Sequence, residues 1–380
     1  MKLLSIEPTP SPNSMKLNLD ERLPAGVRLS YTAEHTESAP PLIARLLRIP
    51  GVKGVFHTAD FIAVDRKGGA DWAVILQEVR EAFGAEGEGS AVAAAAPEAG
   101  GFGEAHVLVQ MFRGIPIQLR VRHGGQESRA AMPERFTKAV TEAAGATMIR
   151  ERKLEELGVR YGEPQDILDE VVRELDAAYP DERLRDLVEQ AQAAGPEAPP
   201  PAPPAPLSGE EVRSVFGSED WRVRYAAFER LKPEPQDVDL LALALRDPQM
   251  SIRRLAVVYL GDLRTPEVMP HLFAALKDSS APVRRTAGDT LSDLGDPAAT
   301  GPMTEALGDA NKLVRWRAAR FLYEAGDETA LEALRRVAAS EPEFEVKLQA
   351  EMAVARIERG EEAAGSVWQQ MTRMREQEKE

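Results

Sequence analysis

The chain has 380 residues, 43% of them hydrophobic and 29% charged, so it can hold two or three folded domains and lacks the composition of a disordered protein. Its net charge of −15 disfavours nucleic acid as a partner, because phosphates would be repelled. The absence of cysteine excludes disulfides, thiolate metal ligands and cysteine nucleophiles. The N-terminus lacks a signal-peptide pattern, and no segment has the roughly 18 apolar residues of a membrane-spanning helix. We therefore expect a cytoplasmic protein.

Two changes in composition divide the chain into three modules. Residues 84–103 mix Gly, Ala and Glu and predict a flexible connector, whereas residues 193–206 are rich in proline and predict a stiff, extended spacer. The expected modules are residues 1–83, residues 104–192 and residues 207–380, the last including a C-terminal cap or tail.

The first module predicts a small α+β domain. Two runs of β-branched and aromatic residues, Val52–His57 and Phe61–Val64, are separated by a short turn and predict a hairpin. Met15–Leu19 alternates apolar and polar residues, as a half-buried strand does. Pro41–Arg48 and Asp71–Phe83 carry apolar residues at helical spacing, so each predicts a helix.

The middle module also predicts an α+β domain. Val107–Met111 and Ile115–Val121 alternate in hydrophobicity on either side of Arg113-Gly114, which predicts a second hairpin. Helices are expected after it, from Pro133, over Asp166–Ala178 and over Asp181–Gln190. We recognise no catalytic motif in this module.

The third module repeats itself. An apolar residue followed by a basic one recurs at intervals of 29, 31, 31 and 32 residues. The five pairs are Val223-Arg224, Ile252-Arg253, Val283-Arg284, Val314-Arg315 and Val346-Lys347. An acid stands six residues before the base in the last four units, as Asp247, Asp278, Asp309 and Glu341.

Each repeat unit is expected to be a pair of helices. Asp247-Pro248 has the pattern of an N-cap followed by proline in the first turn, so we expect each acid to open a helix. Gly261, Gly295 and Gly326 are expected to end helices, since glycine adopts the left-handed conformation that commonly terminates them. The third module therefore predicts an all-α repeat array.

The repeat over Leu207–Arg359 resembles the short HEAT-like units related to those of phycobilin lyases. This resemblance implies a solenoid of stacked helix pairs that needs about three or more units to be stable and uses its concave surface for binding. Non-catalytic binding of a protein partner is the function it implies first.

Four motifs in the first module occur in a characteristic order. They are Glu7–Leu17, Ser38–Leu42, Ile49–Phe56 and Asp60–Val64, followed by Trp72. With these motifs the module resembles the N-terminal domain of Nfu-type iron–sulfur scaffold proteins. That resemblance implies the fold and a partner in the iron–sulfur assembly machinery. It does not imply cluster binding by thiolates, since the sequence has no cysteine.

The order of the three modules is similar to that of the conserved virulence factor C family. We therefore expect an Nfu-like head, an α+β middle module of the virulence-factor type and a HEAT-like solenoid.

The repeated bases form the first candidate site. The five bases Arg224, Arg253, Arg284, Arg315 and Lys347 could form a track for an acidic partner or phosphates. With the acids between them they give a ladder that we expect to be structural, Asp247, Arg253, Asp278, Arg284, Asp309 and Arg315. The alternative, which we favour, is that each base pairs with the acid six residues earlier or with one in the adjacent unit. Arg254, Arg285 and Arg317 lack such an acid in the sequence, so they are the better candidates for binding a partner.

The C-terminal tail forms the second candidate site. Trp368 and Met371 belong to an apolar stripe that predicts either a helix capping the last repeat or a docking peptide. We predict no metal, cofactor or catalytic residue. The five histidines have no metal-site spacing, and no dinucleotide or phosphate-loop motif is present.

The sequence thus favours a non-catalytic adaptor or scaffold. Two alternatives remain open at this stage. The first is an enzyme, a lyase or a nucleic-acid-processing activity, with its site on the concave face of the solenoid. The second is a set of tethered modules that meet only in a larger assembly.

Overall fold

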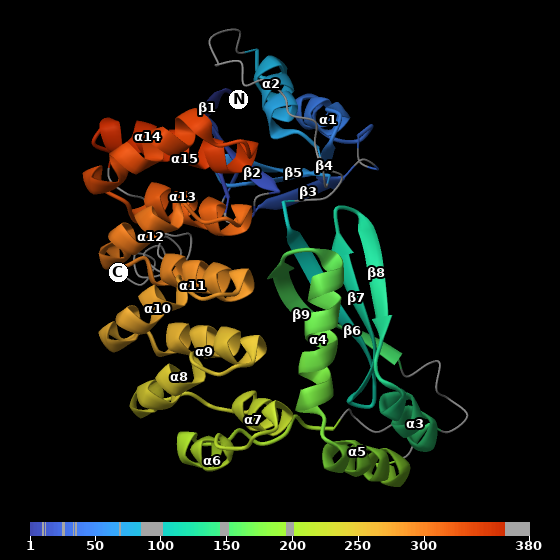
Figure 1. Cartoon of the computed structure of the whole chain (residues 1–380). Coiled ribbons are helices and arrows are strands. Elements are labelled where there is room, and N and C mark those ends of the chain that lie inside the picture. Colours follow the sequence, from blue (N-terminus) through green and yellow to red (C-terminus); the bar gives the residue numbers. More distant parts are fainter. Residues whose placement is uncertain are drawn as a thin grey trace.

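The computed structural model describes residues 1–9, 11, 13–24, 27–32, 34, 36–67, 70–84, 102–144, 152–194 and 201–361. It contains a five-stranded sheet with two helices, a four-stranded sheet with three helices, and a stack of helix pairs (Figure 1). The expected fold class is confirmed, with two α+β modules followed by an all-α repeat array. We call the modules the head, the middle module and the solenoid.

The head is an antiparallel sheet in the order β1-β2-β5-β4-β3. Its elements are β1 (Leu3–Pro8), β2 (Ser14–Leu19), β3 (Arg28–Thr32), α1 (Pro41–Arg48), β4 (Val52–Thr58), β5 (Phe61–Arg66) and α2 (Trp72–Ala82). The predicted hairpin is β4–β5, and β2 joins it along β5. The sequence analysis did not identify the two edge strands, β1 and β3.

The middle module is an antiparallel sheet in the order β8-β7-β6-β9. Its elements are β6 (Glu104–Phe112), β7 (Ile115–His123), β8 (Gln126–Ala131), α3 (Glu134–Ala143), β9 (Arg152–Tyr161), α4 (Pro164–Ala178) and α5 (Asp181–Ala194). The alternating apolar residues of β6 and β7 are buried with side chains of α3 and α4 in one core. The predicted hairpin is β6–β7, whereas β8 and β9 were not expected.

Over residues 207–361, the described part of the solenoid, there are five helix pairs. These are α6 (Gly209–Val215) with α7 (Trp221–Phe228), α8 (Val238–Ala244) with α9 (Met250–Leu263), α10 (Met269–Ala275) with α11 (Ala281–Leu294), α12 (Thr300–Ala306) with α13 (Lys312–Ala325), and α14 (Leu331–Ser340) with α15 (Phe344–Glu358). The second helices of the pairs form one row, which we call the inner row, and the first helices form the outer row (Figure 1). In the part of the chain that is described, no helix has the length and apolarity required to cross a membrane.

Several of the predicted helix boundaries are wrong. Gly261 lies inside α9 rather than at its end, and the C-cap of α9 is Arg264, with a left-handed φ of 51°. The glycine is required there for another reason, because an added Cβ would lie 2.6 Å from Thr290 Cγ2 on the next inner helix. Gly295 ends α11 in the left-handed conformation, as expected. The expectation that each repeat acid opens a helix is also wrong, because each N-cap lies two residues after the acid. The N-caps of α9, α11, α13 and α15 are Gln249, Ser280, Asn311 and Glu343.

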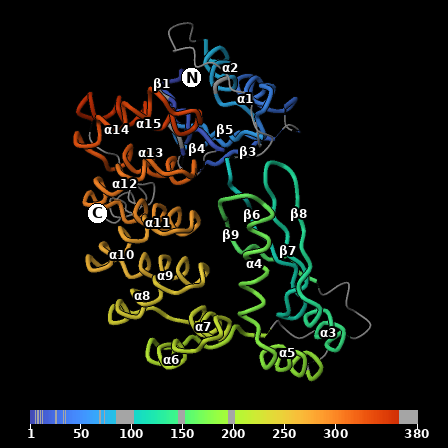
Figure 2. Tube along the Cα trace, viewed as in Figure 1, coloured from blue at the N-terminus to red at the C-terminus, as the bar shows by residue number. Residues whose placement is uncertain are grey.

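The three modules pack against one another instead of standing apart. The inner row faces the middle module, and the head lies against α15 at the C-terminal end of the stack (Figure 2). One continuous core contains buried residues of both the middle module and the solenoid. The alternative of modules that only meet in a larger assembly is therefore wrong. The predicted connector at residues 84–103 lies mostly outside the described residues, as do residues 195–200 of the proline-rich segment. Residues 193–194 of that segment belong to the end of α5.

Candidate functional site

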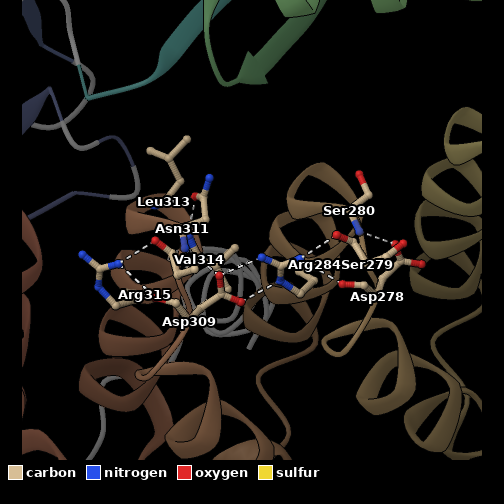
Figure 3. Close-up of polar contacts among 10 residues, drawn as sticks. Asp278, Ser279, Ser280, Arg284, Asp309, Asn311, Leu313, Val314 and Arg315 are labelled. Atoms are coloured by element: carbon tan, nitrogen blue, oxygen red, sulfur yellow. Dashed lines mark hydrogen bonds and ion pairs between the residues drawn. The ribbon is translucent and has the colours of Figure 1, made fainter.

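The arginine ladder connects neighbouring repeats. Arg284 donates from Nε and Nη2 to the Asp309 carboxylate of the next repeat, at 2.6 and 2.8 Å (Figure 3). Its Nη1 donates to the main-chain oxygen of Asp278, 2.9 Å away in its own repeat. Arg253 and Arg315 repeat this geometry with Asp278 and Glu341. The side-chain partner of each ladder base thus lies in the adjacent unit, and the acid six residues earlier offers only its main chain.

The ladder acids have a second role at the helix starts. The Asp309 carboxylate accepts from the main-chain N–H of Asn311, and Asn311 is the N-cap of α13. Burial alone would raise the pKa of Asp309, but the hydrogen bonds from Arg284 and Asn311 outweigh it and hold the pKa below its usual value. Each acid therefore fixes the turn before a helix and the base of the preceding repeat together. These residues are occupied by internal contacts.

Removing a ladder base should destabilise the solenoid. We expect Arg284→Ala to cost about 2–3 kcal/mol of unfolding free energy, since it strands a largely buried carboxylate that now accepts a charged, bidentate hydrogen bond. Arg335→Ala is the matched control, because Arg335 and Glu358 form an exposed pair worth at most about 1 kcal/mol. Urea unfolding followed by circular dichroism measures both variants. Equal losses in the two would contradict this account of the ladder.

Arg254 lies in a buried cluster of four charges between the solenoid and the middle module. Its guanidinium contacts Glu170 and Glu174 on α4, both at 3.1 Å. Arg160 at the end of β9 contacts the same two carboxylates at 3.2 and 2.8 Å. The premise that Arg254 lacks an acidic partner is therefore wrong, because its partners come from another module.

Arg285 and Arg317 also have acidic partners. Both contact Asp289 on α11, and the Arg285 guanidinium stacks on the ring of Tyr161, 4.2 Å from its centroid. Arg285 is only 4% exposed, and its Nε and Nη2 make no hydrogen bond to protein atoms. Burial lowers the pKa of Arg285, and the nearby charge of Arg317 adds to this effect. The three arginines proposed from the sequence as partner-binding residues thus lie where the inner row meets the middle module.

A hydrophobic contact that the sequence analysis missed joins the same two modules. Phe102, assigned to the connector, is buried and packs on Trp316 of α13 with ring centroids 6.3 Å apart. Leu313 and Val346 complete this cluster. The available signal was an aromatic residue just before a predicted strand, because a flexible connector gives an aromatic side chain nothing to pack against.

The head is held on the last repeat by a buried ion pair. Arg66, at the end of β5, contacts Glu345 of α15 at 2.8 Å and stacks on Trp72. Phe344 and Leu348 of α15 pack on the core of the head. The solenoid therefore contacts both other modules through its inner row.

A polar cleft of about 810 Å³ separates the head from the middle module. From the head it is lined by the loop before β2 and the end of β5, and from the middle module by β6 and the turn between β7 and β8. Ser11 of the head donates to Glu104 of the middle module at 2.6 Å, and both residues line the cleft. The cleft is thus built by two modules that the sequence analysis treated as independent.

Most of the acids in the cleft are already engaged. Glu104 accepts from Ser11 and Asn13, and Glu156 contacts His106 at 3.0 Å. Glu127 contacts Arg120, Arg122 and Arg129. Hydrogen bonds from Arg122 and Arg129 lower the pKa of Glu127. Lys67, by contrast, is exposed and forms no ion pair with any described residue.

Three family models match successive parts of the chain. They are Scaffold protein Nfu/NifU N terminal at residues 4–88, Virulence factor at residues 110–188, and HEAT repeats at residues 238–309 and 269–355. The Bacillus subtilis (strain 168) protein YpgR is 54% identical over 377 residues, which is 99% of each chain. Conserved virulence factor C of Staphylococcus aureus (strain NCTC 8325 / PS 47) is 44% identical over 391 residues, covering 98% of this chain and 99% of that protein. The chain belongs to the conserved virulence factor C family.

This membership confirms the family resemblance noted from the order of the modules. Among solved structures, protein SAV1430 of Staphylococcus aureus is 38% identical and covers 22% of this chain and 99% of its own, with a TM-score of 0.21. The candidate residues of the C-terminal tail, Trp368 and Met371, lie outside the described residues.

Proposed function

We propose that this chain is a non-catalytic, cytoplasmic adaptor that binds a protein partner, and that the solenoid holds its head and middle module in a fixed arrangement. HEAT-like repeats suit a binding role, and their concave surface is the usual binding face. In this chain the inner row carries contacts to both other modules, through Arg254 and Arg285 to the middle module and through Glu345 to the head. This intramolecular packing supports the holding role of the solenoid, and the cleft between head and middle module supports the binding role.

The partner is expected to bind at the cleft between head and middle module. The cleft has the volume of an ordinary binding site and is lined by polar groups of two modules. Its acids are largely engaged, whereas Lys67 and the neighbouring Lys53 are exposed at the rim. We therefore expect an acidic segment of the partner to enter the cleft, where these lysines would attract it despite the net charge of −15.

The iron–sulfur assembly machinery is the first place to look for this partner. The support is the match of the head to the N-terminal model of Nfu/NifU scaffold proteins. Because the sequence has no cysteine, we propose contact with an assembly protein and not cluster binding through thiolates.

Affinity capture of the full chain tests both parts of the proposal. The tagged protein is cross-linked in cells and the captured proteins are identified by mass spectrometry, with Lys53→Glu/Lys67→Glu as the cleft variant. Lys232→Glu/Lys277→Glu is the control, because it places the same charge change on exposed residues of the solenoid. We expect a partner that the control retains and the cleft variant loses. Retention by both variants would exclude the cleft, and recovery of no cluster-assembly protein would remove the iron–sulfur link.

One observation favours an enzyme as the second candidate. Asp65 is an exposed residue in the lining of the cleft, and partial burial of its carboxyl group raises its pKa, against the effects of Ser14 and Lys53. A carboxyl group with a raised pKa in a cleft is a candidate general acid or base. This alternative therefore moves from the solenoid to the cleft. Asp65→Asn should leave partner capture intact if the chain is an adaptor, and a metabolite accumulating only with that variant would favour the enzyme.

A further inference from the structure

Strand β9 has an unpaired edge. It is the terminal strand of its sheet, and β6 is the only described strand that pairs with it. Residues Arg152–Leu157 are all exposed, so in this stretch the strand is uncovered on both faces. Leu154 is 42% exposed and Leu157 48%. A long edge strand with exposed leucines is a surface to which another strand can add.

The sequence of this strand is complementary to itself. It reads Arg152, Lys153, Leu154, Glu155, Glu156 before the bulge that follows. In an antiparallel pair of two copies centred on Leu154, Arg152 lies opposite Glu156 of the second copy, and Lys153 lies opposite its Glu155. Directly opposite residues lie on the same face of a sheet, so each charge meets an opposite charge.

Neighbouring registers lack this complementarity. Moving the centre by one residue towards the N-terminus places Lys153 opposite Lys153 of the second copy, and moving it the other way places Glu155 opposite Glu155. Like charges directly opposite each other destabilise strand pairing. Leu154 is therefore the one centre, among these three, at which both leucines meet and both charges are matched.

We propose that two copies of the chain associate through antiparallel pairing of β9 in the register centred on Leu154. The contact joins the two four-stranded sheets into one continuous sheet and satisfies the edge of β9 in both copies. It is isologous, as a two-fold interface requires. A second copy is the occupant that fits, because the charges along β9 complement β9 itself, and these local pairs offset the repulsion between two molecules of net charge −15.

A charge exchange tests the register. We expect the full-length protein to form dimers in light scattering across a concentration series. Lys153→Glu places acids opposite each other twice per dimer and should weaken association about tenfold or more. The double variant Lys153→Glu/Glu155→Lys restores opposite charges and should restore the dimer. Lys138→Glu, on the exposed face of α3, is the control for the change in net charge. A monomer at every concentration, or a double variant as weak as the single one, overturns the proposal.

Single cysteines test the same register by covalent capture. The chain has no cysteine, so Leu154→Cys introduces the only thiol. In the proposed pairing the two Cys side chains lie directly opposite, close enough for a disulfide, and mild oxidation should yield a cross-linked dimer. Lys153→Cys is the control, because Lys153 is also exposed but the proposed pairing holds the two thiols on a diagonal, beyond disulfide reach. Equal cross-linking of both variants, or none with Leu154→Cys, contradicts this register.

Discussion

Arg254→Met is expected to lower the unfolding free energy by about 3–5 kcal/mol, because it leaves two buried carboxylates with one arginine between them. Glu170 and Glu174 are each at most 10% exposed and share Arg254 and Arg160. Methionine keeps most of the volume, so the loss reflects the uncompensated charge and not a cavity. Chemical denaturation at neutral pH measures it.

The control variant lies in the same interface. Arg222 contacts Asp176 of α4 at 3.7 Å but is 54% exposed, so Arg222→Met should cost less than about 1 kcal/mol. Adding Glu170→Gln to Arg254→Met leaves a neutral pair of Arg160 and Glu174 and should recover most of the loss. If Arg254→Met and Arg222→Met behave alike, the buried cluster does not hold the modules together.

The loss in Arg254→Met should also depend on pH. Burial already raises the pKa of Glu170 above its ordinary 4.5, and Glu174 adds to the effect. Removing Arg254 raises it further, so the folded variant binds protons more tightly than the unfolded chain does. The penalty is then fully present at neutral pH and shrinks as pH falls towards 4.5. A difference from wild type that stays constant between pH 7 and pH 5 would contradict this explanation.

The repeat array could be predicted because its signal recurs. A pair of an apolar and a basic residue recurs in five units at a spacing near 31 residues, so each unit supports the assignment of the others. The units form the expected helix pairs. The hairpins β4–β5 and β6–β7 were predictable for a similar reason, since one face of each is buried and the side chains alternate. In these elements the apolar positions of the sequence pattern are the ones that the fold buries.

Strand β9 could not be predicted, because it has no buried face to impose an alternation. Its residues Arg152–Leu157 are exposed throughout, and the sequence pattern there is equally compatible with a helix. The acidic partners of Arg254 could not be predicted from the sequence for another reason. Glu170 is 84 residues away in the sequence, and nothing in either segment records the contact. Arg285 and Arg317 were misjudged for a different reason, because their shared acid, Asp289, lies in the solenoid but not six residues before either base.

Trp316→Ala should be the most damaging single change in the hydrophobic contacts between the modules. Trp316 is 2% exposed and packs on Phe102, Leu313 and Val346, so its truncation is expected to cost about 3–5 kcal/mol. Two buried guanidinium groups, of Arg285 and Arg317, also stack near its ring at 5.7 and 5.5 Å. The cavity would therefore open beside the guanidinium groups of Arg285 and Arg317, whose contacts with the ring are strongest where water is excluded.

The position of the damage distinguishes this prediction from general loss of stability. Hydrogen exchange should accelerate in α13 and also at the start of β6, which follows Phe102, while the outer helix α8 keeps its protection until global unfolding. Trp221→Ala is the matched control, since Trp221 on α7 is only partly buried and should cost about 1–2 kcal/mol without affecting β6. If exchange at β6 does not change in Trp316→Ala, Phe102 does not anchor the middle module, and the shared core and the charged cluster around Arg254 would hold the two modules together without it.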